Sequence, residues 1–220
     1  MAQLFSSGMN TVARVTIIGG ALVVLLGGAA AMNLYWSPLG TNVNVAKEQV
    51  VPFSHRHHVT AMGIDCRYCH TTVETGAFAG IPPTETCMTC HSQVWTEAPM
   101  LAPVRESWDT GKPLEWNRIN DLPDFVYFNH SIHVNRGIGC VTCHGQVDDM
   151  PLTMKAQTLH MKWCINCHEY PEKFIRPKDK VFDLRWTPAS EGKTQADYAG
   201  LVEEYGITKN QLTNCSVCHR

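Results

Sequence analysis

One short motif, Cys-x-x-Cys-His, occurs five times in this chain of 220 residues and uses all ten of its cysteines. The cysteines of the five motifs are Cys66 and Cys69, Cys87 and Cys90, Cys140 and Cys143, Cys164 and Cys167, and Cys215 and Cys218. The histidines that close the motifs are His70, His91, His144, His168 and His219. Two thiols three positions apart on a helical turn reach the two vinyl groups of one porphyrin, and the adjacent imidazole then lies beneath the iron. The motif therefore predicts five covalently bound haem c groups, each with its motif histidine as an axial ligand.

Three other uses of paired cysteines compete with this interpretation. Disulfides suit an exported protein, but a thiol pair three positions apart in every case is a poor structural staple. Zinc sites use four ligands, commonly two Cys-x-x-Cys pairs, so an odd number of motifs leaves one unpaired and the trailing histidine unexplained. A redox-active dithiol does not recur in this way along one chain. Haem attachment accounts for the whole pattern.

Six further histidines are available as second axial ligands: His55, His57, His58, His130, His133 and His160. Four of them belong to a repeated segment, Phe-x-His-x-x-His-Val, which begins at Phe53 and again at Phe128. Each copy continues to a Gly-Ile pair and two Cys-x-x-Cys-His motifs, so the body of the chain contains two copies of one pattern. On helical spacing, two histidines three positions apart project from nearly the same face. Each can therefore reach a different neighbouring iron.

This arrangement resembles the cytochrome c3 and c7 families. The resemblance implies that the first histidine of each copy, His55 or His130, binds the haem of the next motif in the chain. It also implies that the second histidines, His58 and His133, bind two of the other haems. His57 is interpreted as a solvated neighbour of two working ligands.

Filled coordination positions argue against chemistry on a small substrate. When every iron has six ligands, no position remains open, so we expect an electron-transfer subunit that is not catalytic by itself. A terminal multihaem reductase needs a five-coordinate haem, and such enzymes often carry a Cys-x-x-Cys-Lys motif, which this sequence lacks.

An uncharged apolar run from Val15 to Trp36 is long enough to cross a bilayer as a helix. Arg14 precedes the run and Tyr35 and Trp36 close it, as expected for a cytoplasmic N-terminus and an aromatic belt on the far side. We therefore expect a single-pass anchor in the cell membrane, with the haem-binding part on the periplasmic side. The competing interpretation is a cleaved secretory signal, because the alanines at 29–31 would suit a signal peptidase.

The five haem motifs and the apolar run determine how we expect the rest of the chain to be organised. We expect mostly irregular chain with short α-helices, as in a class III-like multihaem cytochrome c, plus the N-terminal transmembrane helix. The connector 96–127 carries four spaced prolines and is expected to be extended. A short amphipathic helix is expected near Thr194 to Tyr205. The predicted segments are residues 1–14 (cytoplasmic), 15–36 (transmembrane), 37–52 (linker), 53–95 (first two-haem module), 96–127 (connector), 128–170 (second two-haem module) and 171–220 (C-terminal wrap with the fifth haem).

Several longer segments resemble the pentahaem subunit of alternative complex III, a bacterial quinol:electron-acceptor oxidoreductase. They are Gly63–His70, Gly80–Met88, Trp116–Ile119, Phe125–His130 and Met161–Cys164. The resemblance favours methionine as the fifth distal ligand, hence Met161, with His160 as the alternative. His160 stands where the family is expected to carry a small polar residue, which puts this ligand in doubt.

The same resemblance implies a set of partners. They are an iron–sulfur subunit related to molybdopterin enzymes, polytopic quinol-binding membrane subunits and a monohaem cytochrome c subunit, with a copper protein or cytochrome c downstream. The net charge of −2 gives no sign of a nucleic-acid partner. A different function that the sequence leaves open is a self-contained quinol dehydrogenase with one membrane helix, which feeds a periplasmic reductase directly.

Overall fold

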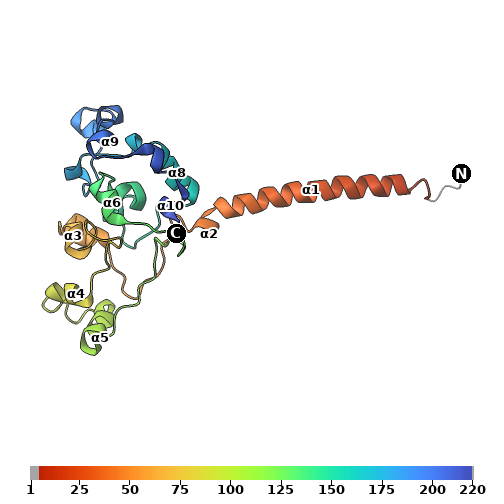
Figure 1. Ribbon diagram of the computed structural model, residues 1–220. Coiled ribbons are helices and arrows are strands. Elements are labelled where there is room, and N and C mark those ends of the chain that lie inside the picture. The colour runs from red at the N-terminus through yellow and green to blue at the C-terminus, as the bar shows by residue number, and fades with distance from the viewer. Residues whose placement is uncertain (1–4, 220) are drawn as a thin grey trace. The chain divides into compact units, whose positions relative to one another are not determined.

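The computed structural model describes residues 5–219 and divides the chain into two compact units, Met1–Asn42 and Val43–Arg220. Each unit is built from different elements. The first is dominated by one long helix, and the second consists of short helices joined by irregular segments (Figure 1).

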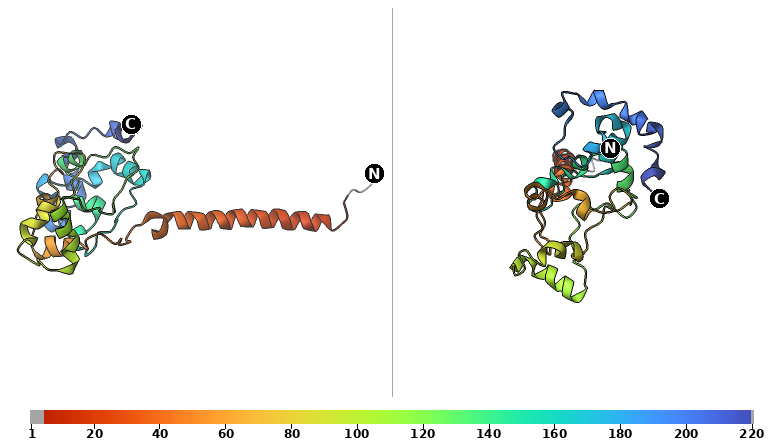
Figure 2. Two further views of the ribbon diagram at one scale, coloured as in Figure 1. Left: turned by 90° about the horizontal axis from the view of Figure 1, so that it is seen from below. Right: turned by 90° about the vertical axis from the view of Figure 1, so that its left-hand side faces the viewer.

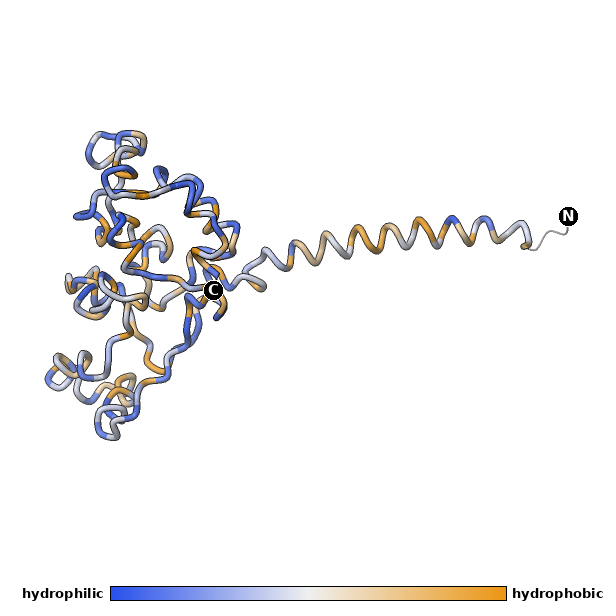
Figure 3. The backbone as a smooth tube through the Cα atoms, viewed as in Figure 1, coloured by the Kyte–Doolittle hydropathy of each residue, from blue (hydrophilic) through white to orange (hydrophobic). Residues whose placement is uncertain are grey.

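Helix α1 runs from Met9 to Trp36, and none of its residues is buried. At about 1.5 Å per residue its 28 residues extend roughly 42 Å, which exceeds a hydrocarbon core of about 30 Å. Figure 3 shows the apolar stretch following α1 along most of its length. Within residues 5–219 it is the one helix long and apolar enough to cross a membrane. It begins six residues before the predicted Val15, and the four-residue helix α2 (Pro38–Thr41) follows it.

The second unit contains no named strand within the described residues, and its isolated β-bridges join distant segments, Val126 with His219 for example. Its α-helices are α3 (Cys66–Cys69), α4 (Thr84–His91), α5 (Ala102–Thr110), α6 (His130–Asn135), α7 (Cys140–His144), α8 (Met161–Glu169), α9 (Leu201–Glu204) and α10 (Cys215–Cys218). One π-helical turn, η1 (Arg56–Ala61), and seven 3-10 turns complete it: η2 (Pro99–Leu101), η3 (Val147–Asp149), η4 (Pro171–Lys173), η5 (Lys178–Lys180), η6 (Pro188–Glu191), η7 (Gln195–Tyr198) and η8 (Lys209–Gln211). Two further views show how much irregular chain connects these pieces (Figure 2). The predicted fold class is confirmed.

Each Cys-x-x-Cys-His motif lies on or at the end of its own short helix: α3, α4, α7, α8 and α10 carry one each. In α3 the carboxylate of Asp65 caps the helix by accepting a hydrogen bond from the backbone N–H of Arg67. One helical turn is all that a motif needs, because its two cysteines must project from the same side.

The apolar core is divided into small clusters instead of forming one continuous interior. One cluster centres on Val104 and Leu101, a second on Val181 and a third on Ile175. Ile175 and Val181 are the largest fully buried side chains among the described residues. Clusters of this size leave the stability of the unit dependent on further apolar material, which haem groups would provide.

The expectation of a fully extended connector is wrong. Helix α5 occupies nine of its residues, Ala102–Thr110, and packs against α4. Its prolines do not prevent this, because Pro99 and Pro103 fall in the first turn of η2 and α5, where the missing N–H is not needed. Gly111, at a φ of 69°, then ends α5 with a left-handed cap.

The single helix expected near Thr194–Tyr205 is also incorrect, because the segment forms two short pieces, η7 and α9. A capping box between Thr194 and Asp197 starts the first piece. Gly200 lies between the two pieces. The apolar side chains of Val202 and Tyr205 are nevertheless buried, against Ile175.

Candidate haem-binding sites

The first copy of the duplicated segment is organised around one aromatic ring. Phe53 stacks on His58, with ring centroids 4.4 Å apart and an interplanar angle of 24°. The same ring meets His55 edge-on at 5.0 Å and 89°. One phenylalanine therefore sets the two imidazoles of this copy nearly perpendicular to each other, so that they face different directions.

The second copy repeats this arrangement closely. Phe128 stacks on His133 at 4.5 Å and 28°, and meets His130 edge-on at 4.7 Å and 90°. Both phenylalanines belong to the sequence repeat, but their residue type alone predicts no role beside a metal ligand. Identical positions in the two copies were the available signal.

Three of these four histidines lie opposite a motif histidine. Ring centroids are 6.3 Å apart for His58 and His91, 6.4 Å for His130 and His144, and 6.2 Å for His133 and His168. The interplanar angles of these pairs differ, at 67°, 10° and 24°.

These separations are those of two imidazoles that share a metal ion. An imidazole nitrogen lies about 1.1 Å from its ring centre and about 2.0 Å from a first-row metal that it binds. Two imidazoles on opposite sides of one ion therefore have ring centres about 6.2 Å apart. All three observed separations fit this value, so the residues fit a haem iron between each pair.

The fourth histidine, His55, lies close enough to His70 for that imidazole to affect its pKa. Burial, together with the nearby imidazole of His70, lowers the pKa of His55 to about 4. Burial likewise lowers the pKa of His144 to about 4, with His130 and His70 adding to the effect. Neutral imidazoles are the form that binds a metal, so burial favours the ligand state.

The Nδ1 atoms of the candidate ligands share one environment. In seven cases Nδ1 lies within hydrogen-bond distance of a backbone carbonyl oxygen: His58 with Ser54, His70 with Gly80, His91 with Val94, His130 with Ala77, His133 with Asn129, His168 with Leu212 and His219 with Phe125. A carbonyl only accepts, so Nδ1 carries the proton and Nε2 keeps its lone pair. This is the tautomer, and the outer hydrogen bond, expected of a histidine that binds metal through Nε2.

Side chains take the place of the carbonyl in two cases. His55 Nδ1 lies 3.1 Å from the hydroxyl of Thr153, and His144 Nδ1 lies 3.1 Å from the amide of Asn120. Neither Thr153 nor Asn120 belongs to a motif, and nothing in the sequence pattern distinguishes them.

None of the ten cysteines forms a disulfide, and eight of them are half-buried. Burial raises the pKa of Cys143 to about 12 and that of Cys140 and Cys167 to about 11. Among residues 5–219 there is no group of three or more His, Cys, Asp or Glu side chains placed to hold a metal ion. Three of the candidate sites thus combine a facing pair of imidazoles with the two cysteines of the motif, a donor set that fits a haem.

The fifth motif closes against a distant part of the chain. His219 forms a bridge with Val126, and its ring lies 5.8 Å from Phe125. Of the two candidate distal ligands, Met161 starts α8 with 62% of its surface exposed, and His160 is the residue that precedes it. His57, the histidine without an expected ligand role, stacks on Trp95 at 5.4 Å and 23°.

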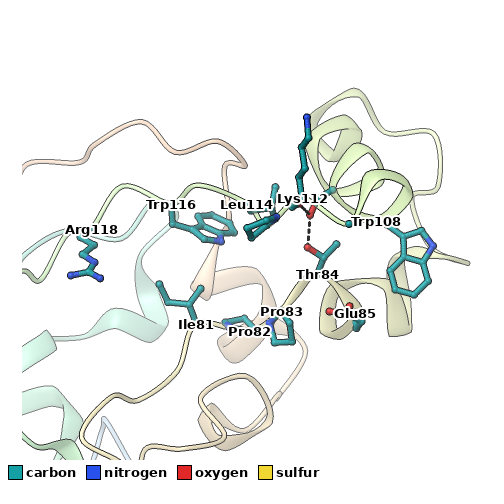
Figure 4. A pocket seen from close by; sticks show the side chains of 13 residues that line it. Ile81, Pro82, Pro83, Thr84, Glu85, Trp108, Lys112, Leu114, Trp116 and Arg118 are labelled. Carbon is teal, nitrogen blue, oxygen red and sulfur yellow. Dashed lines mark hydrogen bonds between the residues drawn. The ribbon is translucent and has the colours of Figure 1, made fainter.

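A pocket of about 630 Å³ lies between the start of α4 and the segment that follows α5 (Figure 4). Trp108, Trp116, Lys112 and Arg118 contribute to its wall. No cysteine or histidine of the described chain lines this pocket. It adjoins the motif Cys87–His91, because Leu114 and Trp116 of its wall pack against the same apolar cluster as Cys87.

Comparison with known proteins agrees with this chemistry. Residues 126–220 match the family described as cytochrome c7 and related cytochrome c. Over 180 residues the chain is 33% identical to the multihaem cytochrome c subunit of menaquinone reductase from Nitratidesulfovibrio vulgaris. The alignment covers 72% of this chain and 86% of that relative.

The duplicated histidine segments and the match over the second copy define the class, a multihaem cytochrome with covalently bound haem c. The chain belongs to the family of multihaem c-type cytochromes that includes the menaquinone reductase subunit.

Proposed function

We propose that this chain is a membrane-anchored pentahaem cytochrome that relays electrons within a quinol:electron-acceptor oxidoreductase of the alternative complex III type. The observation that carries the relay is the pairing of histidines at 6.2–6.4 Å, with distal and motif imidazoles facing each other in three places. When bound, each haem supplies a one-electron Fe(III)/Fe(II) couple.

The chain's own residues hold and tune these groups. The two cysteines of each motif bind the porphyrin, and the motif histidine is one axial ligand. By the same repeat, His55 pairs with His70 as His130 pairs with His144, which completes four sites with two histidines each. At the fifth site we propose Met161 opposite His219, with His160 as the alternative. A methionine there would raise the potential of that haem relative to the other four.

Helix α1 would fix the haem-binding unit to the cell membrane, with that unit on the periplasmic side. The partners we propose are an iron–sulfur subunit related to molybdopterin enzymes, polytopic quinol-binding subunits and a monohaem cytochrome c subunit. Oxidation of one quinol yields a quinone, two protons and two electrons. The electrons leave singly and reduce two molecules of a copper protein or cytochrome c.

The relative's name describes a reductase of menaquinone, the opposite direction of electron flow. The relay residues serve either direction, because the potentials of the donor and the acceptor decide it. An electron-transfer assay on the native complex, purified from membranes, distinguishes the two directions of electron flow. We expect it to reduce a cytochrome c or copper protein when given a quinol; reduction of menaquinone by a reduced cytochrome, without the forward reaction, would overturn the proposed direction.

A self-contained quinol dehydrogenase is the second candidate, favoured by the single apolar helix α1. The same purification separates the two. In the complex, this chain co-purifies with the larger subunits and does not oxidise quinol once isolated. A chain that runs alone and still oxidises quinol would support the second candidate.

A further inference from the structure

The five motifs are numbered here as sites in chain order: site 1 (Cys66–His70), site 2 (Cys87–His91), site 3 (Cys140–His144), site 4 (Cys164–His168) and site 5 (Cys215–His219). Their order in space follows from contacts between the segments that carry them, and it differs from their order in the chain.

Sites 1 and 2 are direct neighbours. The hydroxyl of Tyr68, inside the first motif, lies 2.9 Å from the hydroxyl of Thr89, inside the second. The proposed distal ligands of the two sites, His55 and His58, lie on one continuous segment around Phe53.

Sites 3 and 4 are joined in the corresponding way. Helix α6 carries both His130 and His133, and these face His144 of site 3 and His168 of site 4. Because the two ligands are only three positions apart in the chain, the two sites must lie side by side.

The two modules meet through sites 1 and 3. The start of α6 lies on the loop that follows site 1: the backbone N–H groups of His130 and Ser131 donate to the carbonyls of Ala77 and Gly76. The side-chain amide of Asn135 donates to the carbonyl of Glu74 in the same loop. Behind this contact, Val73 and Val134 form one buried cluster, against which Cys140 packs.

Site 5 adjoins site 4. The carbonyl of Leu212, three residues before the last motif, accepts the Nδ1 proton of His168. On the other side, the backbone N–H of Tyr127 donates to the carbonyl of Cys218. Tyr127 directly precedes Phe128, the ring that stacks on the site 4 ligand His133.

We propose that the sites form a single file in the order 2–1–3–4–5, so that site 2 and site 5 are the two ends at which redox partners exchange electrons with the chain. This order rests on the proposed relay function and adds the path that electrons would take through the chain.

The first module is therefore reversed relative to the chain. Its second motif lies at an end and its first motif lies in the middle, next to the second module. A partner at the Cys87–His91 end is separated from a partner at the Cys215–His219 end by three intervening sites.

The test is nuclear magnetic resonance of the purified full chain in detergent, fully reduced so that every low-spin iron is diamagnetic. The haem content is first measured by mass. Proton–proton contacts between haems then report which sites are adjacent. Two single-ligand variants, His58→Met and His133→Met, mark the resonances of site 2 and site 4, because a methionine bound to iron has shifted methyl signals.

We expect contacts for 2–1, 1–3, 3–4 and 4–5, with sites 2 and 5 having one neighbour each. Five haems with a contact between site 2 and site 3, 4 or 5, or without the 1–3 contact, would overturn the order but leave the relay. Fewer than five haems would instead overturn the proposed function. Should a variant fail to load haem, contacts of the Tyr68 ring with two haems in the wild-type chain identify sites 1 and 2 instead.

Discussion

The Nδ1 hydrogen bonds describe the candidate ligands more fully than the motif does. Each places a proton on Nδ1 and leaves the lone pair of Nε2 available to bind a metal ion, for motif and distal histidines alike. The tautomers of the ligands therefore depend on the folded chain, because some acceptors are distant in sequence. Phe125, the partner of His219, is 94 residues away from it.

Asn120 is the side chain beside His144 whose role can be tested most directly. Its Nδ2 lies 3.1 Å from His144 Nδ1, and no described residue hydrogen-bonds to its buried Oδ1. Turning the amide over lets Oδ1 of Asn120 accept the Nδ1 proton of His144, so that these two atoms are paired. Asn120→Leu removes the acceptor, so the ligand donates less electron density, and we expect the site 3 potential to rise by about 60 mV, a tenfold effect.

A redox titration monitored by visible absorbance and electron paramagnetic resonance measures this shift. Asn120→Asp keeps an acceptor and serves as the control, with the potential staying near or below the wild-type value. An Asn120→Leu protein whose potentials all match wild type would show that the amide does not act on His144.

Gly137 and Gly63 occupy the same position in the two copies, and only Gly137 is crowded. Both have positive φ values, 77° and 69°. A Cβ on Gly137 would lie 2.5 Å from the carbonyl oxygen of Arg176 and 2.8 Å from the ring of Tyr205, whereas at Gly63 nothing lies within 4 Å. We expect Gly137→Ala to destabilise the protein by about 2–4 kcal/mol and Gly63→Ala by about 1 kcal/mol.

Thermal unfolding of the two purified variants, compared with wild type, measures the difference. The shared φ cost cancels in this comparison, so the remainder reports the contact with Arg176 and Tyr205. Equal melting temperatures for the two variants would contradict the packing of Gly137 described here.

The sequence repeat predicted candidate ligands correctly placed in the fold, whereas the proline content of the connector did not predict its helix. The duplicated segment led to His58, His130 and His133 as candidate ligands, and the structure brings each one opposite a motif histidine. The number of prolines did not predict α5, because composition does not distinguish a proline in the first turn of a helix from a proline in a loop. The acceptors of the Nδ1 protons were not predictable, because a backbone carbonyl, such as that of Gly80, is supplied by any residue type.

Helix α1 carries the prediction about attachment to the membrane. Replacing residues 1–36 with a cleavable secretion signal should release the haem-loaded unit as a soluble periplasmic protein, because the apolar surface of α1 is removed. The full chain should stay in the membrane fraction after a high-salt or carbonate wash and should need detergent for extraction. N-terminal sequencing of the full chain also distinguishes an anchor from a cleaved signal, since cleavage after the alanines would remove most of α1.

For the whole molecule, the structure changes how the duplication is understood. The two copies are alike in local geometry, as the rings of Phe53 and Phe128 show. In the proposed order of sites, however, the copies adjoin through the first site of each. The loop after site 1 and the start of α6 form that junction. Two similar modules joined in this way, with one further site added at the C-terminal end, would give a relay with two different ends.

The central claim is that the chain holds five haems, each with two protein ligands. The most direct measurement is the intact mass of the purified full chain, followed by electron paramagnetic resonance and exposure to carbon monoxide. The account predicts a mass with five covalent haems, low-spin signals for all of them and no spectral change on adding carbon monoxide to the reduced protein. A mass with fewer haems, or a high-spin iron that binds carbon monoxide in the native protein, would contradict it.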